Sequence, residues 1–276
     1  MEDYIKNYQF LDVDGKIVAY QRAGEGETLL LVHGITTYSF IWRFIKPILA
    51  KKYDVIAVDL LGAGSSDKTL DVEYSIKTQA KFLYDFAKKL NIEKLHYVGH
   101  DVGGGVGQLF AVIYPEITKS LTLINSVAYD FWPVQPIIAM RTPIIRQLMM
   151  ASLDVGTFKM IIKRGVFDKS KITEEVMKFY FYPLKSKEGR KSFLHFARSL
   201  DNNDLLSITE QLRKLKCPVM IIRGNNDVYL SKAISEKLHN EIKGSLLKIV
   251  DEAGHFIQEE KSELLAQHIE EFCNDR

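Results

Sequence analysis

The chain of 276 residues is 46% hydrophobic, which is enough for a sizeable core, and its length fits one large domain with an insertion. A net charge of +2, without a dense run of Lys or Arg, predicts neither nucleic acid nor membrane partners. The charged start, Met1 to Lys6, lacks the apolar stretch of a secretion signal, and Cys217 and Cys273 are expected to be reduced thiols. We therefore expect a cytoplasmic protein without a metal site.

Strand and helix patterns alternate along the chain. Residues 8–13 and 16–21 flank Asp14-Gly15, a strong hairpin signal. Further apolar, β-branched runs predict strands at 28–33, 54–59, 94–99, 120–125, 218–223 and 246–250, with helices at 38–51, 75–90, 102–114, 232–242 and 261–273. This alternation predicts an α/β fold with a mostly parallel, eight-stranded sheet that helices cover on both faces.

About ninety residues separate the sixth predicted strand from the seventh, far more than one crossover helix needs. We interpret this stretch as a helical cap, residues 129–213, inserted between strands six and seven of a core domain formed by 1–128 and 214–276. Because it leaves the sheet at the carboxyl end of a strand, where open α/β sheets place ligands, it should cover the site.

A carboxylate stands at a strand-turn-helix junction, Tyr97-Val98-Gly99-His100-Asp101-Val102-Gly103-Gly104. Glycines two positions before and two after Asp101 allow a sharp turn that lifts the central side chain above the sheet. A carboxylate that attacks a saturated carbon forms an ester that water can open, whereas attack on an acyl group would form an anhydride. The alternative is that Asp101 only caps the following helix.

The order of two later signals favours catalysis. Asp227 ends the loop after an apolar strand, and His255 lies in the loop after the strand that ends near Val250. Nucleophile, acid and histidine follow one another here in the order expected of an α/β-hydrolase triad.

At this point the chain resembles the α/β-hydrolase superfamily, within the branch of haloalkane dehalogenases and epoxide hydrolases that use an Asp nucleophile. The resemblance rests on residues 33–43 (HGITTYSFIWR), 59–68 (DLLGAGSSDK) and 254–260 (GHFIQEE), and it covers nearly the whole chain outside the insertion. It implies that Asp101 is the nucleophile, His255 the base and Asp227 the partner of His255. The oxyanion would lie against the backbone N–H groups of Ile35 and Val102.

Two positions depart from the dehalogenase pattern. Haloalkane dehalogenases generally carry Trp directly after the nucleophile, and many carry Asn after the His-Gly pair, where Val102 and Ile35 stand here. A halide leaving into an apolar pocket without such donors loses its hydration, at a cost of several kcal/mol. Dehalogenation should be slow unless a cap donor such as Trp132 compensates. Val102 also replaces the Arg that fluoroacetate dehalogenases usually have, which disfavours that activity.

Epoxide hydrolases need no halide site, because the leaving oxygen stays attached and is generally protonated by cap tyrosines. Tyr129, Tyr180 and Tyr182 are the candidates, although Thr36 stands where these enzymes usually have Pro. His33 and Tyr38 are further substrate-binding candidates.

The sequence thus favours an epoxide hydrolase that acts through an alkyl ester of Asp101. The alternatives are a haloalkane dehalogenase with atypical halide ligands, a non-catalytic binding scaffold, and an Asp101 that acts only as a base. We expect a small hydrophobic organic substrate with water, no cofactor, and a monomer or homodimer.

Overall fold

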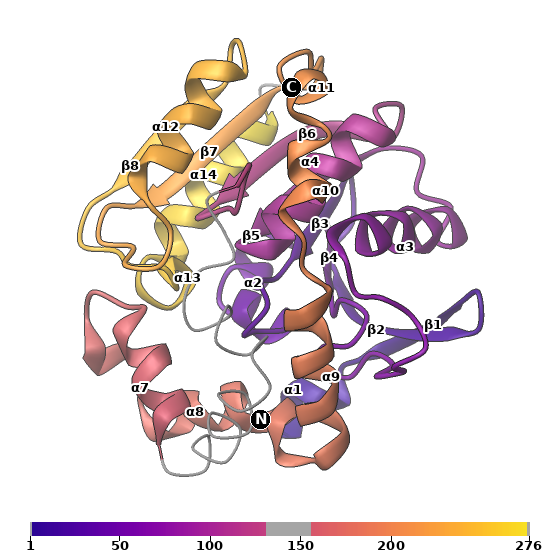
Figure 1. Ribbon diagram of the computed structural model, residues 1–276, viewed down its shortest axis with the longest axis vertical. Coiled ribbons are helices and arrows are strands. Elements are labelled where there is room, and N and C mark those ends of the chain that lie inside the picture. Colours follow the sequence, from indigo (N-terminus) through magenta and orange to yellow (C-terminus); the bar gives the residue numbers. More distant parts are fainter. Residues whose placement is uncertain (1, 131–155, 275–276) are drawn as a thin grey trace.

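A computed structural model describes residues 2–130 and 156–274. It contains an eight-stranded sheet in the order β1-β2-β4-β3-β5-β6-β7-β8 (Figure 1). The first two strands are antiparallel to each other, β2 is antiparallel to β4, and all the other pairs are parallel. The strands are Gln9–Val13, Lys16–Ala23, Thr28–Val32, Asp54–Val58, Leu95–His100, Thr118–Ile124, Val219–Gly224 and Leu246–Val250, in the order β1 to β8. The predicted fold class is confirmed.

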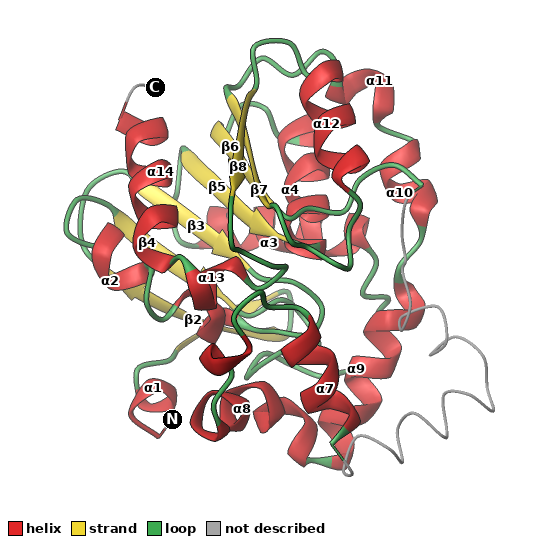
Figure 2. Cartoon of the chain, turned by 90° about the vertical axis from the view of Figure 1, so that its left-hand side faces the viewer, coloured by secondary structure: helices red, strands yellow, loops and turns green. Residues whose placement is uncertain are grey.

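Helices cover both faces of the sheet. Figure 2 shows α2 (Lys46–Leu49) and α14 (Ser262–Asn274) on one face, and α3 (Ile76–Lys89), α4 (Val102–Ile113) and α12 (Lys232–Glu241) on the other. The hairpin turn between β1 and β2 has positive φ at both Asp14 (53°) and Gly15 (79°), as a two-residue turn of this twist requires.

The predicted helix at 38–51 is wrong. This stretch forms a short 3₁₀ helix, η1 (Ser39–Trp42), and then α2, which has Pro47 in its first turn. Proline has no backbone N–H and is tolerated at the first turn of a helix, so it favours a new start over an unbroken helix. The predicted helix at 261–273 corresponds to α14 and is preceded by a short α13 (Ile257–Glu260). The N-terminal α1 (Glu2–Lys6) was not predicted.

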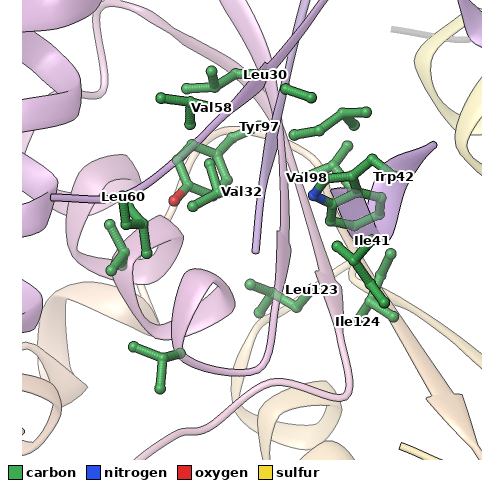
Figure 3. Packing of buried hydrophobic residues seen from close by; sticks show 14 of the residues in the cluster. Leu30, Val32, Ile41, Trp42, Val58, Leu60, Tyr97, Val98, Leu123 and Ile124 are labelled. Atoms are coloured by element: carbon green, nitrogen blue, oxygen red, sulfur yellow. The ribbon is translucent and has the colours of Figure 1, made fainter. Parts of the chain in front are cut away.

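The core is built from the alternating side chains of the central strands. Figure 3 shows Tyr97 and Val98, neighbours in β5, on opposite sides of the sheet, with Val98 beside Trp42. The Tyr97 hydroxyl donates to the carbonyl of Gly103 at 3.0 Å, and a Cβ on Gly107 would lie 2.5 Å from the Tyr97 ring. The glycines in α4 therefore let this helix pack directly on β5. This packing fixes the position of Asp101, which lies between the strand and the helix.

Between β6 and β7 the structure describes further helices. These are α7 (Thr157–Arg164), η3 (Lys169–Lys171), α8 (Glu174–Phe181), η4 (Tyr182–Lys185), α9 (Lys187–Ser199), α10 (Asn202–Leu206) and α11 (Thr209–Leu212). Figure 2 shows α7, α8 and α9 together at one end of the molecule, whereas α10 and α11 pack against α4. The described part of the insertion is helical, and its division from the core at residues 129 and 213 stays a prediction.

Candidate active site

Asp101 occupies a strained turn between β5 and α4. Its backbone has φ 53° and ψ −120°, a conformation rare for a residue with a side chain. A Cβ on Gly103 would lie 2.4 Å from the carbonyl oxygen of His33, and one on Gly99 would lie 2.4 Å from that of Gly103. Both glycines are therefore required by close contact. The Asp101 side chain makes no capping hydrogen bond to α4, so the helix-cap alternative does not describe this residue.

The two oxygens of the Asp101 carboxylate have different surroundings. Oδ2 accepts a hydrogen bond from the backbone N–H of Ile35 at 3.1 Å, and a Cβ on Gly34 would lie 2.5 Å from the same oxygen. Among the described residues, Oδ1 accepts no hydrogen bond. Burial raises the pKa of Asp101, while the charge of His255 and the amides of Ile35 and Val102 oppose that rise. The Ile35 amide thus holds one of the two carboxylate oxygens in place.

His255 and Asp227 form a buried pair. The imidazole Nδ1 lies 3.0 Å from Asp227 Oδ2, while Asp227 Oδ1 accepts from the N–H groups of Tyr229 at 2.8 Å and Leu230 at 3.1 Å. Burial alone would raise the pKa of Asp227, but His255 and the two amides outweigh it and lower the pKa. Burial alone would likewise lower the pKa of His255, yet the carboxylates of Asp227 and Asp101 raise it. Both carboxylates therefore contribute to the raised pKa of the imidazole.

A small cavity lies beside the amide that holds Asp101. Its volume is about 20 Å³, enough for roughly one water molecule. Ile35, Thr36 and Thr37 line it from the core, and Phe158, Tyr180, Pro183, Leu184, Phe193 and Phe196 line it from the insertion. The Tyr180 ring also packs edge-on against Phe256, the residue after His255, with centroids 5.5 Å apart. Apolar side chains dominate this wall.

No group of His, Cys, Asp and Glu that could hold a metal ion occurs among the described residues. Within the same part of the chain, no helix is long and apolar enough to cross a membrane.

The sequence matches the family model of the alpha/beta hydrolase fold over residues 27–262. This chain belongs to the α/β-hydrolase family. An uncharacterized hydrolase of Bacillus subtilis, YugF, is 31% identical over 92% of both chains. A cis-3-alkyl-4-alkyloxetan-2-one decarboxylase of Shewanella oneidensis is 27% identical, over 96% of this chain and 88% of that protein.

Solved structures of the predicted branch are similar to this hydrolase. A putative ancestral haloalkane dehalogenase superimposes with a TM-score of 0.85 at 25% identity, covering 97% of this chain and 98% of its own. The epoxide hydrolase CorEH gives a TM-score of 0.84 over 97% and 98% of the two chains, and at 20% identity it shows the fold alone. The family-level resemblance seen in the sequence is confirmed.

Two of the substrate-binding candidates in this hydrolase can be placed directly. Tyr180 lines the cavity, whereas neither ring nitrogen of His33 is available to bind a substrate. The Nε2 of His33 accepts from the N–H of Leu60 at 2.9 Å, so Nδ1 carries the proton and donates to the carbonyl of Gly34 at 2.7 Å. Burial lowers the pKa of His33 to about 4, which keeps the ring neutral. Because the backbone occupies both nitrogens, the prediction that His33 contacts substrate is corrected: this ring fixes the loop that carries Ile35.

Three more candidates lie elsewhere. Tyr129 donates to Glu241 at 3.0 Å, at the C-terminal end of α12, whereas Asp227 precedes the N-terminal end of that helix, and the substrate contact of Tyr129 stays a prediction. Tyr38 and Tyr182 pack with ring centroids 5.9 Å apart, and neither lines the cavity described above. Trp132 lies outside the described residues.

Sequence reasoning missed two residues that hold the His255 loop. Asn125 Nδ2 donates to the carbonyls of Gly254 at 3.0 Å and His255 at 2.9 Å, while its Oδ1 accepts from the N–H of Gly224 at 2.9 Å. His100 Nε2 donates to the carbonyl of His255 at 2.9 Å. The only sequence signal was the position of each at the end of a predicted strand.

Proposed function

We propose that this protein hydrolyses substrates at a saturated carbon, opening an epoxide to a diol through a covalent alkyl ester of Asp101. The observation that supports this most directly is that the two carboxylate oxygens of Asp101 differ in their hydrogen bonds. Oδ2 is held by the Ile35 amide, and Oδ1 is left without a donor. An oxygen held by an amide is suited to become the carbonyl oxygen of an ester, which supports attack on the substrate by the other oxygen.

In the first step, Oδ1 attacks the substrate carbon and the carbon–oxygen bond of the strained ring breaks. Oδ2 becomes the carbonyl oxygen of the new ester without leaving the Ile35 amide. The electron pair of the broken bond stays on the leaving oxygen, which takes a proton. We assign the donor role to Tyr180, which lines the cavity from the insertion. Its hydroxyl donates to Glu259 Oε1 at 3.4 Å, and it would exchange this long contact for the leaving oxygen of the substrate.

Formation of the ester on Asp101 changes the protonation of His255, the proposed base. Asp101 loses its negative charge, and with it one of the two carboxylates that raise the pKa of His255. The imidazole then becomes neutral more readily, which is the form that can accept a proton. The protonation state of His255 is thereby linked to the presence of the intermediate.

In the second step, neutral His255 takes a proton from water, and the hydroxide attacks the Asp101 carbonyl carbon. Negative charge develops on Oδ2, where the amides of Ile35 and Val102 can stabilise it, each such donor being worth roughly 3 kcal/mol. Collapse releases Oδ1 with the product, which takes the proton from His255. The second proton of the water restores Tyr180.

The leaving group decides between epoxide and halide. Ile35 and Val102 contribute backbone amides to Asp101 but no side-chain donor for a departing halide. An oxygen that stays attached to the substrate needs only one proton donor, so this arrangement favours the epoxide over the alkyl halide. The name of the Shewanella relative supports a four-membered cyclic ester as a second candidate, because this ring also joins a saturated carbon to a strained oxygen.

Heavy-oxygen water and one substitution test the covalent step. We expect turnover of a terminal epoxide in this solvent to leave label in the Asp101 side chain, detectable by mass spectrometry of the peptide. We expect His255→Gln to form the ester but not to hydrolyse it, so the protein gains the mass of the intact substrate. His239→Gln, on α12, is the matched control and should show no adduct.

The same enzyme should be assayed with terminal epoxides, cis-dialkyl oxetanones and bromoalkanes. Diol formation with little bromide release is the expected result. Absence of both label and adduct with every converted substrate would overturn the nucleophilic role of Asp101. Bromide release as fast as diol formation would replace the epoxide with the halide.

A further inference from the structure

The charge of the chain is unevenly distributed. Residues 156–200 contain eleven Lys or Arg and only four Asp or Glu, although the whole chain contains 37 and 35. The net charge of +2 is therefore the sum of a strongly basic segment, residues 156–200, and a remainder of the chain that is acidic. Two of the four acids are already paired within this segment, Glu174 with Lys159 and Glu175 with Lys178.

Part of this positive charge surrounds an open depression. The depression has a volume of about 890 Å³ and lies between α7, the loop that follows it, and the loop 226–228. Lys163, Arg164 and Lys169 line it, and none of the three forms an ion pair with the residues that the structure describes. Figure 1 shows α7 at the lower left edge of the molecule.

Exposed apolar side chains share this depression with the cations. Met160 is 66% exposed, Val228 51% and Phe167 50%, and all three line the same space. Large apolar side chains exposed this far, next to unpaired cations, are typical of surfaces that bind an amphiphilic partner.

We propose that this face of α7 and its following loop binds the surface of an anionic lipid bilayer. The phosphate of an anionic lipid would lie between Lys163, Arg164 and Lys169, and Met160 and Phe167 would enter the boundary between headgroups and acyl chains. A nucleic acid would match the charge but would leave these apolar side chains in water. The two features together therefore favour a lipid surface, a partner that the small net charge of the whole chain did not predict.

Vesicle binding tests this proposal independently of catalysis. We expect the purified full chain to sediment with vesicles that contain phosphatidylglycerol but not with pure phosphatidylcholine, and the bound fraction to fall with added salt. Lys163→Glu/Arg164→Glu/Lys169→Glu should weaken binding at least about tenfold, because each cation near an anionic surface contributes separately. Met160→Ser/Phe167→Ser should weaken binding while leaving the charge unchanged.

The matched control is Lys88→Glu/Lys243→Glu/Lys248→Glu, which makes the same change in charge at exposed positions outside the depression. It should bind almost as well as the wild type, and circular dichroism should show that every variant is folded. Equal loss in the control, equal binding to both vesicle types, or binding of a single-stranded oligonucleotide in place of vesicles would overturn the proposal. Competition by glycerol phosphate at micromolar concentration would also overturn it, since a small anion would then suffice.

Discussion

A buried carboxylate costs stability at the position of the proposed nucleophile. Asp101 is only 8% exposed, and burial raises its pKa above the ordinary value despite the Ile35 amide. Because the folded state favours the protonated form, the wild type loses stability as the pH rises from the pKa of the unfolded chain through the raised pKa of the folded protein.

We therefore expect Asp101→Asn to be inactive and more stable than the wild type at pH 7, by roughly 1 kcal/mol. The gain should shrink as the pH falls below the pKa of Asp101 in the folded protein, where the wild-type carboxyl group is neutral. Thermal unfolding of both proteins across this pH range measures the difference. A variant less stable than the wild type at neutral pH would show that the carboxylate stabilises the fold.

At this scale the sequence predicted Asp101, Asp227 and His255, because each follows a strand and local spacing reveals that. It could not predict that Asn125 would reach the carbonyl of His255, 130 residues away. Nor could it show that the backbone would occupy both nitrogens of His33. Such contacts depend on how strands are ordered in the sheet, which no single motif contains.

Glycines of two kinds hold together the elements around the turn that carries Asp101. An added Cβ on Gly103 would meet backbone atoms of Val32 and His33, on a strand end that cannot move without the sheet. The three atoms nearest to an added Cβ on Gly34 all belong to the Asp101 side chain. The first glycine is required for the packing of β3 against α4, and the second only for the position of the carboxylate.

Gly103→Ala and Gly34→Ala should accordingly separate stability from activity. We expect Gly103→Ala to lower the free energy of unfolding by about 3 kcal/mol or more, as overpacking against backbone does. Gly34→Ala should cost less stability but reduce ester formation strongly, because the carboxylate must leave the Ile35 amide. Denaturant unfolding and single-turnover alkylation measure the two effects, and equal effects of both variants on both measurements would contradict this assignment.

Strand patterns were predicted well because β3 to β7 are apolar and bounded by turns, and their observed limits differ from the prediction by only one or two residues. The prediction for 38–51 was wrong because the apolar spacing of this stretch suits one long helix, while Pro47 and the packing of Trp42 in the core favour two short helices.

For the whole molecule, both cysteines are free and both are protected by the fold. Burial raises the pKa of Cys217 to about 11 and that of Cys273 to about 12, from an ordinary value of 9.0. Since the thiolate is the reactive form, the reactive fraction of Cys217 is about a hundredfold smaller than that of an ordinary thiol.

We expect native protein to react slowly with a thiol reagent at pH 8 and the denatured chain to react at once at two sites. The rate in increasing denaturant should follow loss of the fold as measured by circular dichroism. Fast reaction of one thiol in the native state would show local opening near that cysteine.

The overall architecture could be predicted from the alternation of strand and helix patterns alone. The basic surface could not be predicted from the net charge, because the net charge sums segments that are distant in the chain.

The hold of Ile35 on a single oxygen of Asp101 has an isotopic consequence. Each cycle would send the attacking oxygen away with the product and replace it from the solvent, while its neighbour stays bound to the amide. Suppose that the Asp101 carboxylate never rotates to exchange its two oxygens. In heavy-oxygen water, the first product of each enzyme molecule then carries ordinary oxygen and every later product carries the heavy isotope. However long the reaction runs, the enzyme would then retain one heavy atom in that side chain and never two.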